Sequence, residues 1–204
     1  MALRKTTVAE LPSTAIRLTR EEAIEYQYEA IRQWQPESEM WPLMYGSLAM
    51  GAVSSLSGAV INEYFRRTLF LPKSSLIVIG MPVIGVASLI LTIAHHKLTS
   101  DLLLMNTPCM PCLQGKSALL VGFFGTIYPV IGSSVGNMMQ AQRMGTTYIP
   151  SLTKERPKFF KFWQQLIQKK SSFFAKSLAV NIVLATVVTH YQQKAFFRLN
   201  QQDQ

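Results

Sequence analysis

Four long stretches of this chain contain no Asp, Glu, Lys or Arg, and they constrain its fold more than any other feature. They cover residues 40–62, 74–96, 117–142 and 177–193, with 23, 23, 26 and 17 residues. Charged residues make up 15% of the 204 residues, against roughly 25% in an average soluble protein. The deficit is confined to the four stretches, so an ordinary aqueous sequence is interrupted by four apolar blocks. This distribution argues against a soluble enzyme, a disulfide-stapled mini-protein and a disordered chain.

The blocks have the length that membrane-spanning helices need. A helix rises about 1.5 Å per residue, so a block of 23 residues reaches roughly 35 Å and crosses a hydrocarbon core of about 30 Å. Buried helices of soluble proteins are commonly shorter and amphipathic, whereas these blocks are apolar on every face. We therefore predict an all-α polytopic membrane protein with about four transmembrane helices, near residues 43–63, 74–95, 117–139 and 173–192. The fourth is the weakest, because 17 charge-free residues reach only about 26 Å.

The predicted spans divide the chain into three parts. Residues 1–39 form an N-terminal tail with an amphipathic helix, residues 40–193 form the four-helix transmembrane domain, and residues 194–204 form a polar C-terminal tail. The first 20 residues are basic and rich in hydroxyl groups, with one acid, and they lack the apolar run of a secretory signal. This composition suggests a mitochondrial address, and a soluble tail is the alternative.

A short helix is predicted just before the first span. Thr19 and Glu22 have the spacing of a capping box, in which each side chain accepts a hydrogen bond from the backbone N–H of the other residue. Apolar residues at helical spacing follow and share one face: Ile24, Tyr28, Ile31 and Trp34. We expect the helix to end near Pro36 and either to lie on the membrane surface or to bind a partner.

Basic residues gather where the chain leaves the predicted spans. Arg66 and Arg67 follow the first span, where adjacent arginines contact lipid headgroups or a partner. The long third loop contains a segment, residues 154–170, in which Phe and Trp are interleaved with Lys. This pattern predicts a basic amphipathic segment that binds anionic membrane lipids. Nucleic-acid binding is the competing use of such a segment, but lipid contact is the simpler account beside a span, and we expect no nucleic-acid partner.

Small residues and prolines inside the spans predict how the helices pack. Gly132 and Gly136 form a small-xxx-small pair, which permits the close approach of a second helix from this chain or from a partner. Pro82 and Pro129 lie within the second and third spans, and each removes one backbone hydrogen bond. Both of these helices are therefore expected to kink.

Polar side chains within the spans are few. Asn137 and Asn181 are expected to form interhelical hydrogen bonds, either with a partner or within this chain. His95, His96 and His190 lie at predicted span ends, where we expect an interfacial place rather than a catalytic one. No span carries a charged side chain in its middle, as a proton pump or an ion-coupled carrier needs. Without a phosphate-binding loop or a metal-ligand cluster, we predict no catalytic residue, no cofactor and no metal, and hence no enzyme.

Cys109 and Cys112 are the two cysteines of the chain. The Cys-x-x-Cys spacing suits a disulfide, a redox pair or half of a zinc site. A four-thiolate site cannot form within one chain that has two cysteines. No βαβ pattern surrounds the pair, which argues against a thioredoxin-like activity. A structural disulfide, a free thiol pair and a redox function all stay open at this point.

Several short motifs occur in an order that resembles a known family. An Asn-x-x-Phe-Arg-Arg motif begins at Asn62 after the first span, and a Gly-Met-Pro motif begins at Gly80 in the second. The paired cysteines come next, and a glycine-rich run from Gly122 leads into Tyr128 and the proline after it. Over residues 40–192, these features resemble the transmembrane protein 126 family of the mitochondrial inner membrane. The paired cysteines are similar to its A-type branch.

The resemblance implies a binding role in the assembly of respiratory complex I (NADH:ubiquinone oxidoreductase). It implies a non-catalytic, multi-pass protein of the mitochondrial inner membrane that binds and stabilises membrane-arm subunits, with other assembly factors as further partners. One alternative is a small membrane thiol or redox protein that uses Cys109 and Cys112. Another is a lipid-binding structural membrane protein or a resident accessory subunit.

Overall fold

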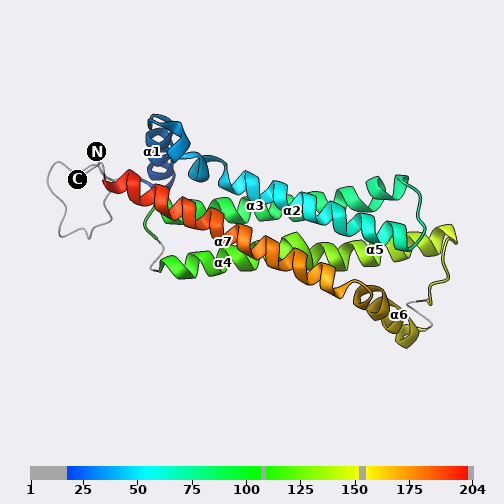
Figure 1. Ribbon diagram of the computed structural model, residues 1–204. Helices are drawn as coiled ribbons and strands as arrows, with labels where there is room; N and C mark the ends of the chain where they lie inside the picture. The colour runs from blue at the N-terminus through cyan, green and yellow to red at the C-terminus, as the bar shows by residue number, and fades with distance from the viewer. Residues whose placement is uncertain (1–17, 107–108, 152–154, 202–204) are drawn as a thin grey trace.

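Antiparallel helices of membrane-spanning length make up most of the chain. The computed structural model describes residues 18–106, 109–151 and 155–201. Within these ranges every regular element is a helix, which confirms the predicted all-α class. Among the described residues, four segments are long and apolar enough to cross a membrane: Trp41–Thr68, Leu76–Leu103, Met110–Met144 and Ser171–Gln201. They run side by side and alternate in direction (Figure 1).

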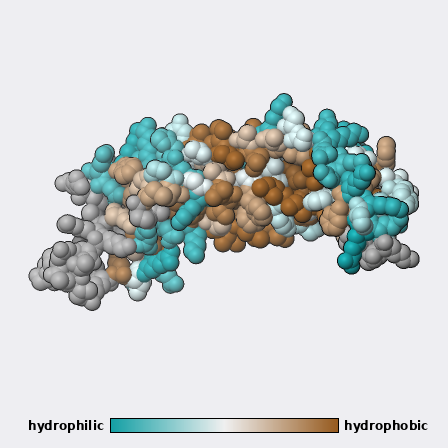
Figure 2. All heavy atoms as spheres, turned by 90° about the horizontal axis from the view of Figure 1, so that it is seen from below, coloured by the Kyte–Doolittle hydropathy of each residue, from teal (hydrophilic) through white to brown (hydrophobic). Residues whose placement is uncertain are grey.

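The surface of this bundle has the side-chain distribution that a bilayer requires. On the face drawn in Figure 2, apolar side chains form a band around the middle, and hydrophilic side chains cover both ends. All four segments contribute exposed apolar residues to the surface, among them Leu48, Leu56, Leu89, Ile93, Leu119 and Val183. Water would penalise so large an apolar surface, whereas lipid tails solvate it. The chain is therefore a multi-pass membrane protein.

Two of the spans are single α-helices that exceed their predicted limits. α2 comprises Trp41–Thr68 and α7 comprises Ser171–Gln201. α7 thus continues through most of the segment in which the sequence suggested a polar tail. Ala195, Phe196 and Leu199 recur at helical spacing and are buried against the end of the bundle, which extends the helix. Residues 202–204 of that tail, and residues 1–17 with the expected mitochondrial address, lie outside the described residues.

The other two spans each contain a π-helical turn followed by a proline. In chain order their pieces are η3 (Leu76–Gly80) and α3 (Met81–Leu103) in the second span, and α4 (Met110–Gly122), η4 (Phe123–Ile127) and α5 (Tyr128–Met144) in the third. Pro82 and Pro129 are the second residues of α3 and α5. Proline has no N–H, so the preceding turn loses a backbone donor. At Phe124, Ser54 Oγ of α2 donates to the carbonyl instead, at 3.1 Å. The distortion expected at both prolines thus takes the form of a widened turn.

α1 (Arg20–Arg32) begins with the predicted capping box. Thr19 N–H donates to Glu22 Oε2 at 2.7 Å, and Glu22 N–H donates to Thr19 Oγ1 at 3.3 Å. The bonds from Thr19 hold the pKa of the Glu22 carboxyl below its ordinary value. The helix ends at Arg32, one turn before Pro36, and the short helix η2 (Glu37–Glu39) then leads into α2.

α1 lies crosswise to the long helices, at the end of the bundle where α7 finishes (Figure 1). Its buried residues are Ala23, Gln27 and Ile31, so the buried side is turned slightly from the predicted apolar face. Arg20 Nη2 pairs with Asp101 Oδ1 at 2.7 Å, and Tyr28 Oη lies 3.3 Å from His96 Nδ1. Because Asp101 and His96 belong to α3, these contacts fasten α1 to the end of the second span.

α6 (Arg156–Gln168) lies at the opposite end of the bundle (Figure 1). It forms most of the predicted basic segment, of which residue 154 lies outside the described residues. Phe159 and Leu166 are buried in a cluster with Phe65 of α2. Trp163 Nε1 donates to Ser134 Oγ of α5 at 2.8 Å. The bundle therefore covers the apolar face of α6, and its exposed lysines with Phe160 remain available to a membrane surface.

Candidate functional site

Buried polar side chains form interhelical hydrogen bonds at three levels of the bundle. The first group, which we call the histidine network, comprises Ser47 of α2, His95 and Thr99 of α3, Ser117 of α4, and Thr189 and Gln192 of α7. All six residues are buried. The network therefore ties all four spans together in the half of the bundle that carries α1.

The hydrogen bonds of the histidine network have a preferred direction. Thr189 Oγ1 donates to Ser117 Oγ at 2.8 Å, so the Ser117 proton is free for His95 Nε2, 3.1 Å away. The proton of a neutral imidazole then sits on Nδ1, which lies 3.2 Å from Ser47 Oγ. Both ring nitrogens of His95 are thus satisfied without a charged partner.

Gln192 extends the histidine network to the start of α2. Its Nε2 donates to Thr99 Oγ1 at 3.2 Å and to the carbonyl of Pro42 at 3.0 Å. Gly46 leaves the room for this amide, because a Cβ at Gly46 would lie 2.5 Å from Gln192 Nε2. A glycine on one helix thereby admits an amide from another.

The position of His95 differs from the sequence expectation. We expected an interfacial residue at a span end, but His95 is only 1% exposed. The reason is that α3 continues to Leu103, which moves His95 inside the span. His96 and His190 are exposed, as an interfacial place requires. The sequence of the second span alone could not predict that His95 is buried, because its hydrogen-bond partners Ser47 and Ser117 come from other spans.

The second group surrounds Asn181 in the middle of the bundle. Ser57 Oγ donates to Asn181 Oδ1 at 3.2 Å, and Asn181 Nδ2 donates to Thr126 Oγ1 at 2.9 Å. Gly125 again makes room for the amide, since a Cβ there would lie 3.0 Å from Asn181 Nδ2. Asn181 therefore uses its hydrogen bonds within this chain rather than on a partner.

The third group, which we call the asparagine pair, lies nearer α6. Asn137 Nδ2 donates to Asn62 Oδ1 and to the carbonyl of Ser133, both at 2.7 Å. Three buried atoms of the group have no hydrogen-bond partner among the described residues: Asn62 Nδ2, Asn137 Oδ1 and Ser133 Oγ. Gly80 faces Asn62, and a Cβ there would lie 2.7 Å from Nδ2. The asparagine pair is therefore only partly satisfied.

Gly132 and Gly136 of α5 face the second span. A Cβ at Gly132 would lie 3.0 Å from Val83 Cγ1, and one at Gly136 would lie 2.6 Å from Ile79 Cγ2. The two glycines thus lie where α5 meets the second span of the same chain. In this arrangement Val83 and Ile79 fill the space that a partner helix would need.

Arg66 and Arg67 share one carboxylate but differ in exposure. Arg66 donates to Glu63 from Nε and Nη2, both at 2.7 Å, and to the carbonyl of Leu71 from Nη1 at 2.8 Å. Arg67 Nε donates to Glu63 Oε1 at 2.6 Å. The side chain of Arg66 is 12% exposed and that of Arg67 is 74% exposed. Arg66 therefore fastens the turn after α2, and Arg67 is the arginine that a headgroup or a partner can reach.

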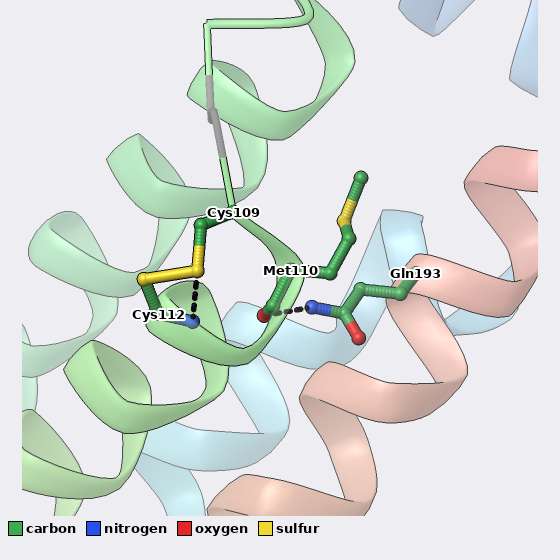
Figure 3. The surroundings of a disulfide bond; sticks show 4 residues. All are labelled: Cys109, Met110, Cys112 and Gln193. Carbon is green, nitrogen blue, oxygen red and sulfur yellow. Dashed lines mark hydrogen bonds between the residues drawn. A yellow bond between two sulfur atoms is a disulfide. The ribbon is translucent and has the colours of Figure 1, made fainter.

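Cys109 and Cys112 form a disulfide at the first turn of α4 (Figure 3). Cys109 is the N-cap residue, and its sulfur accepts a hydrogen bond from the Cys112 N–H at 3.2 Å. Gln193 of α7 donates to the carbonyl of Met110 at 2.8 Å and accepts from Gln114 at the same distance. These bonds hold the disulfide turn against α7. Within the described ranges, no three His, Cys, Asp or Glu side chains gather into a metal-ion site.

The outer surface of α3 offers a different kind of site. Only 17% of the most apolar window of the second span is buried, against 44% for the third span. A Cβ at Gly85 would meet nothing within 4 Å. Met81 and Leu89, one helical turn to either side, are 68% and 65% exposed. An open glycine between exposed apolar side chains allows the backbone of a second helix to come close.

Comparison with known proteins places the whole arrangement in a family. The profile of the family described as Transmembrane protein 126 matches residues 20–203. Transmembrane protein 126 of Drosophila melanogaster is 27% identical over 201 residues, which cover 98% of this chain and 90% of that protein. Transmembrane protein 126A of Homo sapiens is 27% identical over 165 residues, and that of Mus musculus is 26% identical over 165 residues, in each case 80% of both chains. No solved structure matches the chain.

Proposed function

Because this chain belongs to the transmembrane protein 126 family, we propose that it is a non-catalytic assembly protein for respiratory complex I. It acts in the mitochondrial inner membrane, where it binds membrane-arm subunits and stabilises them until their final neighbours arrive. Other assembly factors are its further partners. The role rests on the resemblance in sequence and on the outer surface of α3.

The single observation that carries the binding role is the open glycine of the second span. The glycines at 46, 80, 125, 132 and 136 each face a side chain of another span of this chain, whereas a Cβ at Gly85 would meet nothing within 4 Å. Gly115 and Gly145 are open as well, but they lie near the start of α4 and at the end of α5, not in the middle of a span. Small residues at a helix surface permit the close packing that drives helix association in lipid. Gly85 and the exposed Met81 and Leu89 therefore supply a packing surface for one helix of a partner subunit.

The contacts at this surface suit temporary binding. Asn137 and Asn181 hydrogen-bond within this chain, so they do not add polar contacts to a partner. Packing against Gly85 without strong polar bonds gives an interface that a later subunit can displace. Neither a nucleotide nor a redox reaction is needed for that exchange.

The test is to express tagged chains in mitochondria that lack the endogenous protein. Gly85→Leu fills the open site and should reduce the co-purification of complex I membrane-arm subunits severalfold after mild detergent extraction. The matched control is Val183→Leu, at a 58% exposed position on α7. Gly85→Leu should also leave complex I incomplete on native gels while other respiratory complexes persist. Normal complex I with Gly85→Leu would remove Gly85 from the proposal, and normal complex I without any chain or paralogue would remove the assembly role.

A second candidate function uses the disulfide at the start of α4. Cys112 is exposed, so a thiolate of another protein can reach it. A thiol oxidoreductase would lose its activity in the double variant Cys109→Ser/Cys112→Ser. An assembly protein with a structural disulfide would keep its partners in that variant, with lower thermal stability.

A third candidate function is lipid binding or membrane shaping through α6. Its lysines and Phe160 are exposed beside the bundle, where anionic headgroups lie. Salt-sensitive binding of the full chain to anionic vesicles, lost when the α6 lysines become glutamine, would favour this function. A resident accessory subunit would instead co-migrate with finished complex I.

A further inference from the structure

A polar cavity that is open to the surface lies between the start of α2 and the last turns of α7. Its volume is about 240 Å³, and its lining includes Glu39, Trp41, Tyr191, Lys194 and Arg198. This volume is several times the roughly 30 Å³ that one water molecule occupies in the liquid. The cavity therefore has room for an anionic group larger than a water molecule.

The cavity sits at the level where both helices leave the apolar part of the membrane. Glu39 is the last charge before the first charge-free block, and Lys194 is the first charge after the fourth. The hydrogen bond from Gln192 to the Pro42 carbonyl holds the start of α2 and the last turns of α7 at the same level. Trp41 and Tyr191 line the cavity and are 44% and 49% exposed. Such half-exposed aromatic residues favour the headgroup region of a bilayer.

The charges in the cavity favour an anion. Arg198 Nη1 pairs with Glu39 Oε1 at 2.7 Å, so these two charges compensate each other. Lys194 has no ion-pair partner among the described residues, and its exposed ammonium remains available. The first two residues of α2, Trp41 and Pro42, line the same cavity, so the partial positive charge at the N-terminus of this 28-residue helix lies beside it. The cavity thus presents one uncompensated positive charge at headgroup level.

The apolar surface below the cavity distinguishes a lipid from a soluble anion. Tyr45 and Leu48 of α2 are 58% and 64% exposed, and Val187 of α7 is 43% exposed. They follow the cavity residues along each helix toward the middle of the bundle. An acyl chain can lie along them while its headgroup occupies the cavity.

We propose that this cavity binds the phosphodiester of an anionic phospholipid. Lys194 binds the phosphate oxygens, Trp41 and Tyr191 border the glycerol, and the acyl chains lie against α2 and α7. The ammonium group of a zwitterionic headgroup would meet Lys194 with like charge, so the site prefers a headgroup with net negative charge. The site lies at the opposite end of the bundle from α6 and is independent of the proposed assembly role.

The test uses the purified full-length protein in neutral detergent and native mass spectrometry. The probes are phosphatidylglycerol, phosphatidylcholine and sodium phosphate at equal concentrations. The wild-type protein should retain phosphatidylglycerol in preference to phosphatidylcholine. Lys194→Gln should weaken the binding of phosphatidylglycerol about fivefold, and Lys194→Arg, which keeps the charge, should restore it.

The matched control is Lys97→Gln. Lys97 is also exposed, and it is the first charge after the second charge-free block, at the same end of the bundle but outside the cavity. This variant should bind phosphatidylglycerol like the wild type. An equal loss in Lys97→Gln, or equal retention of the two lipids by the wild type, would overturn the proposal. Displacement of phosphatidylglycerol by equimolar sodium phosphate would overturn the lipid assignment.

Discussion

The histidine network and the asparagine pair lie toward opposite ends of one bundle and differ in how fully their polar atoms are bonded. In the histidine network, Ser117 and Ser47 satisfy both nitrogens of His95. In the asparagine pair, Asn62 Nδ2 and Asn137 Oδ1 have no partner among the described residues. Buried polar atoms cost free energy when they are unpaired. The histidine network therefore fixes the register of four helices, while the asparagine pair leaves that end less tightly specified.

The difference follows from which helices contribute to each group. α7 crosses the histidine network and supplies Thr189 and Gln192, so four helices surround the imidazole. The asparagine pair receives side chains from α2 and α5, and the facing residue of the second span is Gly80. A glycine provides space for an amide but no side-chain donor or acceptor. Small residues therefore determine how closely the helices approach, and the number of helices around a buried polar group determines how many side-chain hydrogen bonds it can form.

The largest expected effect comes from removing the centre of the histidine network. His95→Leu should lower the free energy of unfolding by about 2–3 kcal/mol, because Ser47 and Ser117 lose a partner and the apolar side chain fills the site imperfectly. Reversible unfolding in mixed detergent micelles, followed by circular dichroism, measures this change. His190→Leu is the control, since His190 is exposed and a surface change costs about 0.5 kcal/mol or less. Equal losses of stability in both variants would mean that the histidine network does not stabilise the fold.

A smaller change in the free energy of unfolding should distinguish Gly80, which faces a side chain of another span, from Gly85, which faces none. Gly80→Ala should lower the free energy of unfolding by about 1–2 kcal/mol, because the added methyl group displaces the Asn62 amide. Gly85→Ala meets nothing within 4 Å, and it should raise stability by up to about 1 kcal/mol through the better helix propensity of alanine. The same unfolding assay distinguishes the two. If both substitutions changed stability in the same direction, the packing assigned to Gly80 would be wrong.

The smallest effect should come from the asparagine pair. Asn62→Leu and Asn137→Leu should each cost about 1 kcal/mol, because each leaves the remaining amide with fewer partners. The double variant should cost less than the sum of the two, since replacing both partners removes the unpaired atoms as well. A double-mutant cycle measures this coupling. Strict additivity would mean that the bond between Asn62 and Asn137 contributes nothing to stability.

The sequence predicted the spans well because charge is excluded from the bilayer core. It predicted their ends less well, since charges such as Lys116 and Lys194 are exposed at the surface and do not stop a helix. α4 begins at Met110, seven residues before the predicted start of the third span, and Cys109 is its N-cap. The capping box of α1 was predicted in full, because all its parts lie within four consecutive residues.

The sequence alone could not predict the histidine network or the cavity at Lys194. Each combines residues from helices that are distant along the chain, and no segment alone carries their pattern. Ala195, Phe196 and Leu199 did carry a readable signal, because their helical spacing indicates that α7 continues. The polar residues around these three favoured the prediction of a polar tail instead.

The placement of α7 has a consequence for how the protein is made. Asn181, Thr189 and Gln192 all belong to this last span, which leaves the ribosome after the other three. Until then Ser57, Thr126 and Ser117 face lipid or the insertion machinery without their partners on α7. A chain whose translation stops before α7 would thus present polar groups within the membrane, which marks it for quality control. The insertion of α7 and the closure of the bundle become one event.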